Sequence, residues 1–290
     1  MFTQFPRRHR VSFVGDFHLA QAQTAPSPVD SNKILKKKLK KLSKQLYELQ
    51  RALYAEDQRS LLLVFQAMDA AGKDSTIRSV MRGVNPAGCQ VHSFKQPSAE
   101  ELDHDFLWRS SQRLPQRGRI GIFNRSYYEE VLVVRVHPEY LGAQKLPGEI
   151  NTHAFWEERY ESIRSHEQHL ARNGTVVIKF WLNVSQDAQK ARFLSRLNEP
   201  EKNWKFSAGD LKERTFWQQY MDAYAMALNQ TSRPWAPWYA IPADNKLAMR
   251  VEVAETIVAT LSAMNPAYPQ VAASTRKQFA KIRQQLLTGD

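Results

Sequence analysis

The stretch Leu61–Ile77, LLLVFQAMDAAGKDSTI, decides the fold. It opens with five consecutive apolar residues, 61–65. A run this short and dense indicates a strand buried on both faces of a parallel sheet. A loop of small residues ending in Gly72-Lys73 follows, and then a helix with a polar first turn. Strand, small-residue loop and helix in this order predict a phosphate-binding loop.

The start of that helix gives the prediction its physical basis. Backbone N–H groups there have no partner of their own and point at an anion, and the helix dipole favours negative charge. Lys73 adds a mobile cation. We therefore expect the loop and the first helical turn to bind phosphate, through Ala70, Ala71, Gly72, Asp74, Ser75 and Thr76.

The loop departs from the general pattern G-x-x-x-x-G-K-[ST] at two positions. Ala67 stands in place of the first glycine, and Asp74 stands in place of the hydroxyl residue. A strand, turn and helix that merely contain Gly-Lys would be the ordinary alternative. Asp69 is unusual in such a loop, because a carboxylate repels phosphate unless it holds a metal ion or takes a proton.

The composition is that of a globular protein with an excess of positive charge. The 290 residues suffice for one large α/β domain or two small ones, and 41 Lys+Arg against 29 Asp+Glu give a net charge of +12. The excess predicts a polyanionic partner: nucleic acid, an acidic membrane surface or a long inorganic anion. The single cysteine, Cys89, excludes an intrachain disulfide. Without a membrane-length apolar run or the apolar core of a secretory signal, a cytoplasmic location is expected.

Four more strands are predicted after the first, each followed by a helix. The strands are expected at 89–94, 118–123, 175–184 and 238–241, and the helices after them at 100–114, 127–136, 186–197 and 247–264. Two further helices are expected at 151–172 and 213–230. The alternation predicts an α/β fold, with a parallel five-stranded sheet flanked by helices on both faces.

Three regions of the chain are distinguished. Residues 1–32 are expected to form an irregular arm that lies on the body, with a short edge strand at 10–14. Residues 33–265 form a single domain, and 266–290 form a mostly polar tail.

Residues 33–54 predict a long helix with two distinct sides. Leucines with alternating spacings of four and three form a packing seam, and eight Lys or Arg against one Glu lie between Lys33 and Arg51. Two interpretations stay open. The seam packs on the sheet and leaves a solvated basic face, or this face contributes to subunit pairing or attracts an anion.

Other candidate site residues follow two of the predicted strands. The strand at 118–123 ends on Asn124 and Arg125, at the edge where ligands of open parallel sheets bind. Phosphate-loop enzymes usually carry an acid in the place of Asn124, which can orient a water but brings no charge. Arg125 can bind phosphate with two parallel hydrogen bonds. Lys179, in a core strand, either reaches the functional end of the sheet or pairs with an acid.

The segment 199–212, EPEKNWKFSAGDLK, is polar and basic, with Trp204 between two lysines. A mobile basic segment beside a phosphate loop is typical of a lid. An ordinary connecting loop is the alternative. His137, which precedes a proline, is interpreted as structural more readily than as a substrate contact.

Six segments together resemble the polyphosphate kinase 2 family, from about residue 30 to about residue 265. They occur in the family's order and spacing: AMDAAGKDSTI, NPAG, FNRSYYEEVLVVRVH, KFWLNVSQDAQKARFLSRL, EKNWKFS and APWYAIPAD. The family transfers a phosphoryl group between inorganic polyphosphate and a nucleotide, with Mg²⁺. Its phosphate-loop fold is similar to that of thymidylate kinase and includes a lid. The departures at Ala67 and Asp74 are tolerated in this family.

The resemblance implies roles for particular residues. Asp69, Lys73 and Arg125 are implied to be catalytic or phosphate-binding, and 199–212 is implied to be the lid. Asn124 and Glu129, in the pattern N-R-S-x-Y-E, are similar to the branch called class III. That branch is associated with phosphorylating both nucleoside monophosphates and diphosphates.

The chemistry of phosphoryl transfer extends these roles. We expect Asp69 to hold Mg²⁺, Glu129 to help place the acceptor nucleotide or hold a second metal, and Lys73 and Arg125 to clamp the transferring group. Asn124 would help to place the acceptor. The polyphosphate path is expected to be lined by basic side chains: Lys179, Arg192, Arg196, Lys202 and Lys205.

The expected substrates are polyphosphate and adenine or guanine nucleotides, in the ATP-forming direction, and a homodimer or homotetramer is expected. Neither a membrane nor a nucleic acid is expected as partner. Two alternatives stay open: an ATP-dependent nucleotide kinase on the same fold, or a basic nucleic-acid-binding protein with a disused phosphate loop.

Overall fold

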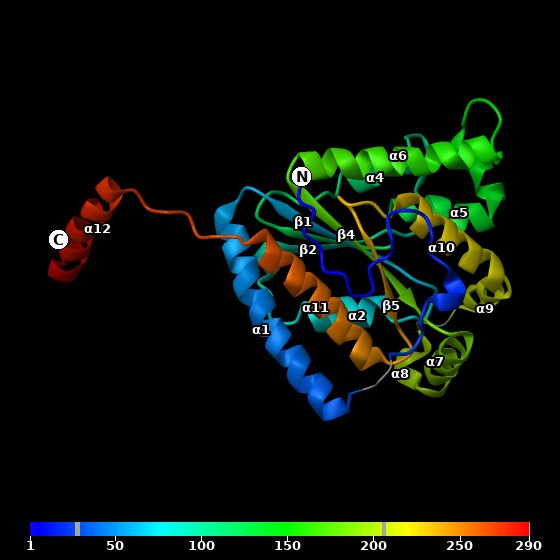
Figure 1. The fold of residues 1–290 in the computed structure, drawn as a ribbon, viewed down its shortest axis with the longest axis horizontal. Helices are drawn as coiled ribbons and strands as arrows, with labels where there is room; N and C mark the ends of the chain where they lie inside the picture. Colours follow the sequence, from blue (N-terminus) through cyan, green and yellow to red (C-terminus); the bar gives the residue numbers. More distant parts are fainter. Residues whose placement is uncertain (27–29, 205–206, 290) are drawn as a thin grey trace.

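The computed structural model describes residues 1–26, 30–204 and 207–289. Its centre is a five-stranded, all-parallel sheet in the order β2-β3-β1-β4-β5 (Figure 1). The strands are β1 (Ser60–Gln66), β2 (Cys89–Ser93), β3 (Ile120–Asn124), β4 (Thr175–Asn183) and β5 (Trp238–Pro242). Strand β1 is central and buried along its whole length, as its apolar run predicted. The predicted fold is confirmed.

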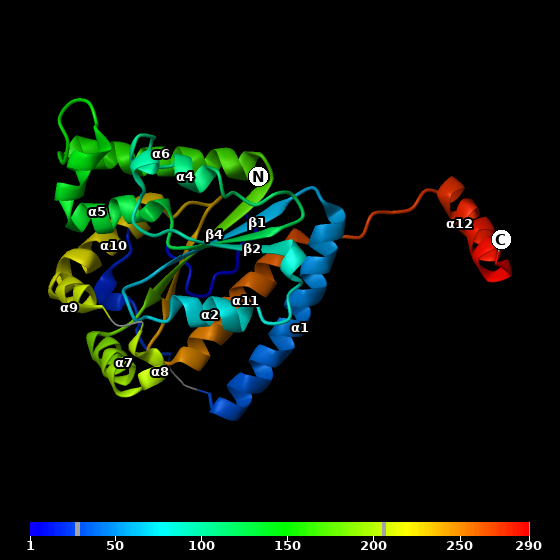
Figure 2. The same cartoon turned by 180° about the vertical axis from the view of Figure 1, so that it is seen from behind.

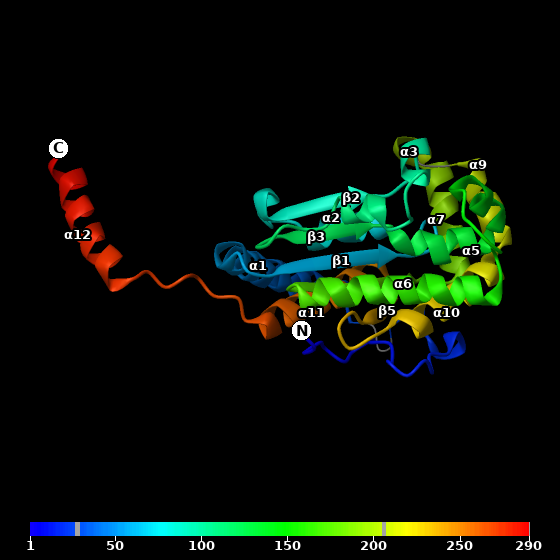
Figure 3. The same cartoon turned by 90° about the horizontal axis from the view of Figure 1, so that it is seen from above.

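Helices cover both faces of the sheet (Figure 1). One face carries α1 (Asn32–Glu56), α2 (Lys73–Val80) and α11 (Lys246–Met264), and the other carries α6 (His153–Arg172) and α10 (Trp217–Thr231). Beyond the carboxyl ends of the strands lie α7 (Gln186–Asn198) and α9 (Ala208–Thr215) (Figure 3), with α8 (Pro200–Asn203) beside α7 (Figure 1). The phosphate loop, between β1 and α2, opens at this same end.

The leucine seam of α1 packs inside the molecule. Leu35, Leu42, Leu46 and Leu53 are buried in the main hydrophobic core. Helices α1 and α11 lie side by side and run in the same direction. Lys38 pairs with Glu255 at 2.7 Å, and past the end of α1 Arg59 donates to the carbonyl of Met264, the last residue of α11, at 2.7 Å. The packing interpretation of the seam is therefore confirmed, and the seam is not available for pairing subunits.

Two helices predicted from the sequence are broken in the structure. In place of a helix at 100–114 there are two short ones, α3 (Ala99–Leu102) and α4 (Trp108–Ser111). The Asp105 carboxylate accepts from the N–H of Leu107 at 2.9 Å, which favours a turn between them. The helix predicted at 127–136 is a 3₁₀ turn, η3 (Tyr127–Val131), followed by α5 (Val133–Val136). Three other 3₁₀ turns are η1 (Leu19–Gln21), η2 (Pro86–Gly88) and η4 (Pro138–Gln144).

The two terminal regions behave differently. The amino-terminal arm lies on the body, with Phe5 and Val11 buried. The edge strand predicted at 10–14 is reduced to one bridge between Arg10 and Tyr239. The tail contains a helix that the sequence interpretation missed, α12 (Ala273–Thr288), which extends away from the body and has no buried residue (Figures 1 and 2). Among the described helices, none is long and apolar enough to cross a membrane.

Candidate phosphate-transfer site

The phosphate loop is held in a conformation that few residues adopt. Gly72 has φ 104° and Ala70 has φ 60°, both in the left-handed region. Glycine suits position 72 because of this φ, since a Cβ there would lie 3.4 Å from the Met249 side chain, an ordinary contact. Gly72 caps α2 by its backbone alone, and the first N–H groups of the helix face the loop.

Lys73 is the first residue of α2, and its side chain folds back over the loop. Its ammonium donates to the carbonyl of Ala67 at 2.7 Å. Burial lowers the pKa of Lys73, and the charge of Arg125 lowers it further, while Asp69 and Glu129 raise it. Lys73 therefore shares one electrostatic neighbourhood with Arg125, Asp69 and Glu129, as the sequence predicted.

Arg125 lies between two carboxylates. Its guanidinium donates to Asp69 of the phosphate loop at 2.9 Å and to Glu129 at 3.2 Å. Glu129 and then Asp69 raise the pKa of Arg125 against the effect of burial. The backbone of Arg125 is also in the left-handed region, at φ 65°. Its N–H donates to the carbonyl of Phe65 at 3.1 Å, which fixes the turn after β3 against the end of β1.

Asn124 connects three elements beside this group. Its side-chain amide donates to Asp74 of α2 at 2.6 Å and is 3.4 Å from the hydroxyl of Ser93 in β2. Asp74 is thus held at the start of α2 by a hydrogen bond, and its carboxylate points to the carboxyl ends of β2 and β3. Within α2, Ser75 donates to the carbonyl of Gly72 at 3.0 Å, and Thr76 is fully buried.

Helix α7 holds the phosphate loop from its outer side. Arg192 donates to the backbone carbonyls of Ala70 and Ala71 at 3.2 and 2.7 Å, and also to the carbonyl of Asp244 at 3.0 Å. Gln189, one turn earlier, donates to the carbonyl of Asp69 at 2.9 Å. The prediction that Arg192 lines the polyphosphate path is wrong, because its guanidinium is buried and bound to carbonyl oxygens. Sequence reasoning missed Gln189, since an amide in an amphipathic helix carries no signal of a backbone partner.

Lys179 is also placed differently from the prediction. It is fully buried, and its ammonium contacts Glu167 at 2.5 Å, the hydroxyl of Tyr128 at 2.9 Å and the carbonyl of Thr231 at 2.9 Å. Burial lowers the pKa of Lys179 to about 8. All three donor directions of the ammonium are used inside the core. Lys179 therefore pairs with an acid, the other possibility that the sequence left open, and does not contact an anion in solvent.

The predicted lid contains short helices, α8 and the start of α9. Arg196 pairs with Asp210 of α9 at 3.3 Å, and Lys202 pairs with Glu199. Burial and the charge of Asp69 raise the pKa of Asp210, which puts α9 in electrostatic contact with the loop. Lys205 lies outside the described residues.

His137 has a structural environment. It is buried, and its ring contacts Glu213 of α9 at 3.0 Å and Glu139 at 3.2 Å. These contacts tie η4 to α9 and agree with the structural interpretation.

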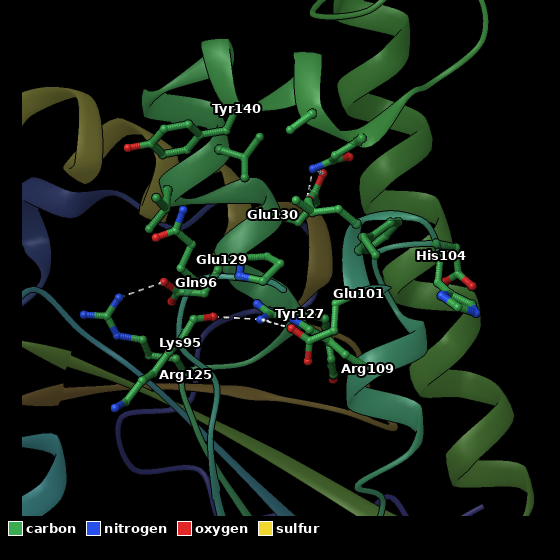
Figure 4. Close-up of a pocket in the computed structure, with 18 of the residues that line it drawn as sticks. Lys95, Gln96, Glu101, His104, Arg109, Arg125, Tyr127, Glu129, Glu130 and Tyr140 are labelled. Atoms are coloured by element: carbon green, nitrogen blue, oxygen red, sulfur yellow. Dashed lines mark hydrogen bonds and ion pairs between the residues drawn. The ribbon is translucent and has the colours of Figure 1, made fainter. Parts of the chain in front are cut away.

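A cavity of about 320 Å³ opens beside Arg125 and Glu129 (Figure 4). Its far side carries Arg109, which donates to the carbonyl of Lys95 at 2.7 Å and lies 3.7 Å from Glu101. Aromatic and apolar side chains complete the lining, among them Phe106, Tyr127, Val133, Val134 and Tyr140. The sequence interpretation missed this wall, because it assigned 100–114 to one helix and did not relate its apolar residues to those of 127–136.

The site offers two carboxylates to a metal ion, Asp69 and Glu129. No group of three His, Cys, Asp or Glu that could hold a metal is present in residues 1–26, 30–204 and 207–289. The guanidinium of Arg125 forms an ion pair with each of these two carboxylates and so links Asp69 to Glu129. Mg²⁺ is commonly bound by one or two carboxylates plus substrate phosphates and water, and this donor set is compatible with that pattern.

Known proteins share this chain's sequence and its fold. The family model "Polyphosphate kinase 2" matches residues 30–269. An ADP-polyphosphate phosphotransferase of Rhodopseudomonas palustris is 56% identical over 244 residues, 84% of each chain. An AMP/ADP-polyphosphate phosphotransferase of Meiothermus ruber is 45% identical over 236 residues, 81% of this chain and 84% of the relative.

The crystal structure of polyphosphate kinase 2 from Arthrobacter aurescens superposes with a TM-score of 0.85 at 36% identity. The match covers 96% of this chain and 98% of that one. The chain belongs to the polyphosphate kinase 2 family.

Proposed function

We propose that this protein transfers phosphoryl groups between inorganic polyphosphate and AMP or ADP, reversibly and with ATP formation as the main direction. One observation carries the proposal: Arg125 joins the phosphate loop, through Asp69, to the wall of the cavity, through Glu129. A donor phosphate on the loop and an acceptor phosphate at the cavity mouth would therefore meet at one guanidinium. The names of the two relatives, an ADP-polyphosphate and an AMP/ADP-polyphosphate phosphotransferase, support this choice.

The transfer itself needs positioning and charge neutralisation. An oxygen of the acceptor's terminal phosphate forms a bond to the end phosphorus of polyphosphate. The bond from that phosphorus to its bridging oxygen breaks, and the shortened polyphosphate keeps the electron pair. Lys73 and Arg125 neutralise the charge spread over the transferring group, which is the main contribution that proteins make to this reaction.

Asp69 has two roles in the proposal. It orients Arg125, and its partly exposed carboxylate binds Mg²⁺ together with phosphate oxygens, while Glu129 supports the metal or the acceptor. Bound Mg²⁺ would supply further positive charge at the transferring group. Asn124 holds the Asp74 side chain in place by a hydrogen bond and thereby shapes the protein surface next to the acceptor.

The cavity beside Glu129 is proposed to take the nucleoside of the acceptor. Its volume and its mixed apolar and polar lining suit a small organic ligand. Guanine nucleotides are proposed as further acceptors, because an apolar wall accepts either purine. We also propose that the enzyme acts in the cytoplasm, where adenine nucleotides are available, and assembles as a dimer or tetramer.

The decisive experiment mixes the purified protein with AMP or ADP, long-chain polyphosphate and Mg²⁺, without ATP, and follows nucleotides by chromatography. We expect ADP and then ATP to appear from AMP, and ATP from ADP. If only ADP is converted, the proposed reaction stands and AMP is not an acceptor. If neither reacts and ATP phosphorylates a nucleotide instead, the protein is an ordinary nucleotide kinase and the proposal is wrong.

A further inference from the structure

The solvent-facing side of α1 carries a row of cations. Lys33, Lys37, Lys40 and Lys44 are all exposed and follow one another at spacings of four, three and four residues. Positions with these spacings share one face of an α-helix, with neighbouring Cβ atoms about 5–6 Å apart. With a rise of 1.5 Å per residue, the row is about 17 Å long. We refer to these four residues as the lysine row.

The charge of the lysine row is not balanced by acids. Within the described part of the chain, none of its members lies within ion-pair distance of a carboxylate, whereas Lys38 of the same helix pairs with Glu255. Lys36 and Lys41, which flank the row, are also exposed and without an ion pair in the same residues. Like charges three and four positions apart disfavour the helix that carries them. A bound polyanion would remove this repulsion.

The lysine row begins near the basic side of the proposed lid. Because α1 and α11 run side by side in the same direction, the amino end of α1 lies toward the amino end of α11. The first residue of α11 is Lys246, whose pKa is lowered by partial burial and by the nearby cations Arg192, Lys202, Arg250 and Arg196. Figures 1 and 2 draw α7 and α8 at this same end of the molecule. The positive charge of the lid and of Lys246 therefore lies at the same end of the molecule as the start of the row.

We propose that the lysine row is a second docking surface for polyphosphate, which holds the part of a long chain that extends beyond the catalytic site. The choice of polyanion rests on the proposed function. A flexible chain with a negative charge on each phosphate can follow mobile ammonium groups at regular intervals without a shaped pocket. Since screening confines such attraction to about 8 Å at physiological salt, the chain has to lie along α1. Short polyphosphates, which end within the catalytic site, do not reach the row.

The test compares two variants that lose the same charge at different places. One carries Lys33→Gln, Lys37→Gln, Lys40→Gln and Lys44→Gln, which retain good helix formers on an exposed face. The control carries Arg276→Gln, Lys277→Gln, Lys281→Gln and Arg283→Gln in α12, which extends away from the body. KM is measured for a long-chain polyphosphate and for a polyphosphate of a few units, at low and at physiological salt. Circular dichroism verifies that both variants are folded.

For the lysine-row variant, we expect KM for the long chain to rise roughly three- to tenfold, because each exposed ion pair contributes little by itself. KM for the short chain should stay within about twofold, and the long-chain KM should depend less on salt. An unchanged long-chain KM, an equal rise for the short chain, or an equal rise in the α12 control would overturn the proposal.

Direct binding separates this proposal from the proposed function. Calorimetric titration of long-chain polyphosphate into the unaltered protein and the lysine-row variant, without nucleotide, should show weaker binding to the variant. If the protein binds polyphosphate but transfers no phosphoryl group, the proposed function is wrong while this difference still tests the lysine row. If the variant loses affinity for RNA or DNA but not for polyphosphate, the row serves a nucleic acid and the proposal is wrong.

Discussion

The guanidinium of Arg192 in α7 donates a hydrogen bond to the backbone carbonyl of Ala71 in the phosphate loop, at 2.7 Å. The N–H of Ala71 itself donates to the carbonyl of Met68 at 3.2 Å, so both backbone groups of this loop residue have partners within the protein. The loop is thus held from outside by a cation whose guanidinium is bound to backbone carbonyls.

Arg192→Met should lower stability and kcat together. The carbonyls of Ala70 and Ala71 would lose their buried donor, at a cost of about 1–3 kcal/mol for each unsatisfied group. We expect the free energy of unfolding to fall in denaturant titrations, with kcat reduced by at least tenfold. A variant with normal stability and a raised KM for polyphosphate would instead indicate that Arg192 contacts polyphosphate.

Lys73→Ala should lower kcat by about 10²-fold or more, as expected for the loss of one charge contact made in a transition state. Steady-state kinetics with saturating polyphosphate and ADP measure this. Lys73→Arg keeps the charge and is the matched control, with a smaller loss expected. Near-normal turnover of the alanine variant would remove Lys73 from the mechanism.

The activity should have an alkaline limit set by the same residue. Because burial and Arg125 lower the pKa of Lys73 from its usual 10.5, the ammonium loses its proton at a lower pH than a free lysine. Activity that needs the charged form is complete below this lowered pKa and falls as the pH rises through it. A profile of kcat/KM against pH should show this limb, and Lys73→Arg should move it to higher pH. An identical limb in both proteins would assign it to another group.

Asp69→Asn should weaken the response to Mg²⁺. The amide keeps the shape of the side chain but neither pairs with Arg125 as a charge nor binds a hard cation well. We expect kcat to fall by about 10²-fold and half-maximal activity to need a higher Mg²⁺ concentration. Glu129→Gln is the comparison, since it leaves the loop intact. A normal Mg²⁺ titration for Asp69→Asn would place the metal elsewhere.

The buried pair of Lys179 and Glu167 should contribute to stability and not to substrate binding. Lys179→Met leaves an unpaired buried carboxylate, so we expect a loss of about 3–5 kcal/mol in the free energy of unfolding. Lys179→Met combined with Glu167→Leu removes both charges and should recover part of that loss. KM for polyphosphate should be unchanged in whichever of the two variants folds. A raised KM with normal stability would contradict the assignment.

The sequence predicted the sheet well because its signals are local. Strand β1 was predicted from its apolar run alone. The candidate residues at the end of β3 were predicted from their position along that strand. This also sufficed to bring Asp69, Lys73 and Arg125 into one site, since the carboxyl ends of adjacent parallel strands meet at one edge.

The prediction failed where a side chain's partner is distant in sequence. Arg192 and Lys179 are basic residues near the functional end, and nothing local distinguishes a cation that meets phosphate from one that meets a carbonyl or a buried acid. The cavity wall was missed for a related reason. Helix α3 ends at Leu102, and Asp105 accepts from the N–H of Leu107 in the turn before α4, a competition that the apolar spacing of 100–114 does not reveal.

The arm across β5 also limits how the sheet can associate. Val11 donates to the carbonyl of Trp238 and His9 accepts from the N–H of Ala240, both at 2.9 Å, so the outer hydrogen-bonding groups of β5 already have partners there. In the described residues, β2 is then the edge with unpaired backbone groups along its length. A sheet that is open on one side can join one neighbour and no more. A two-fold axis at that edge would set two β2 strands antiparallel, and the ten-stranded sheet so formed would have no free edge from which to grow into a fibre.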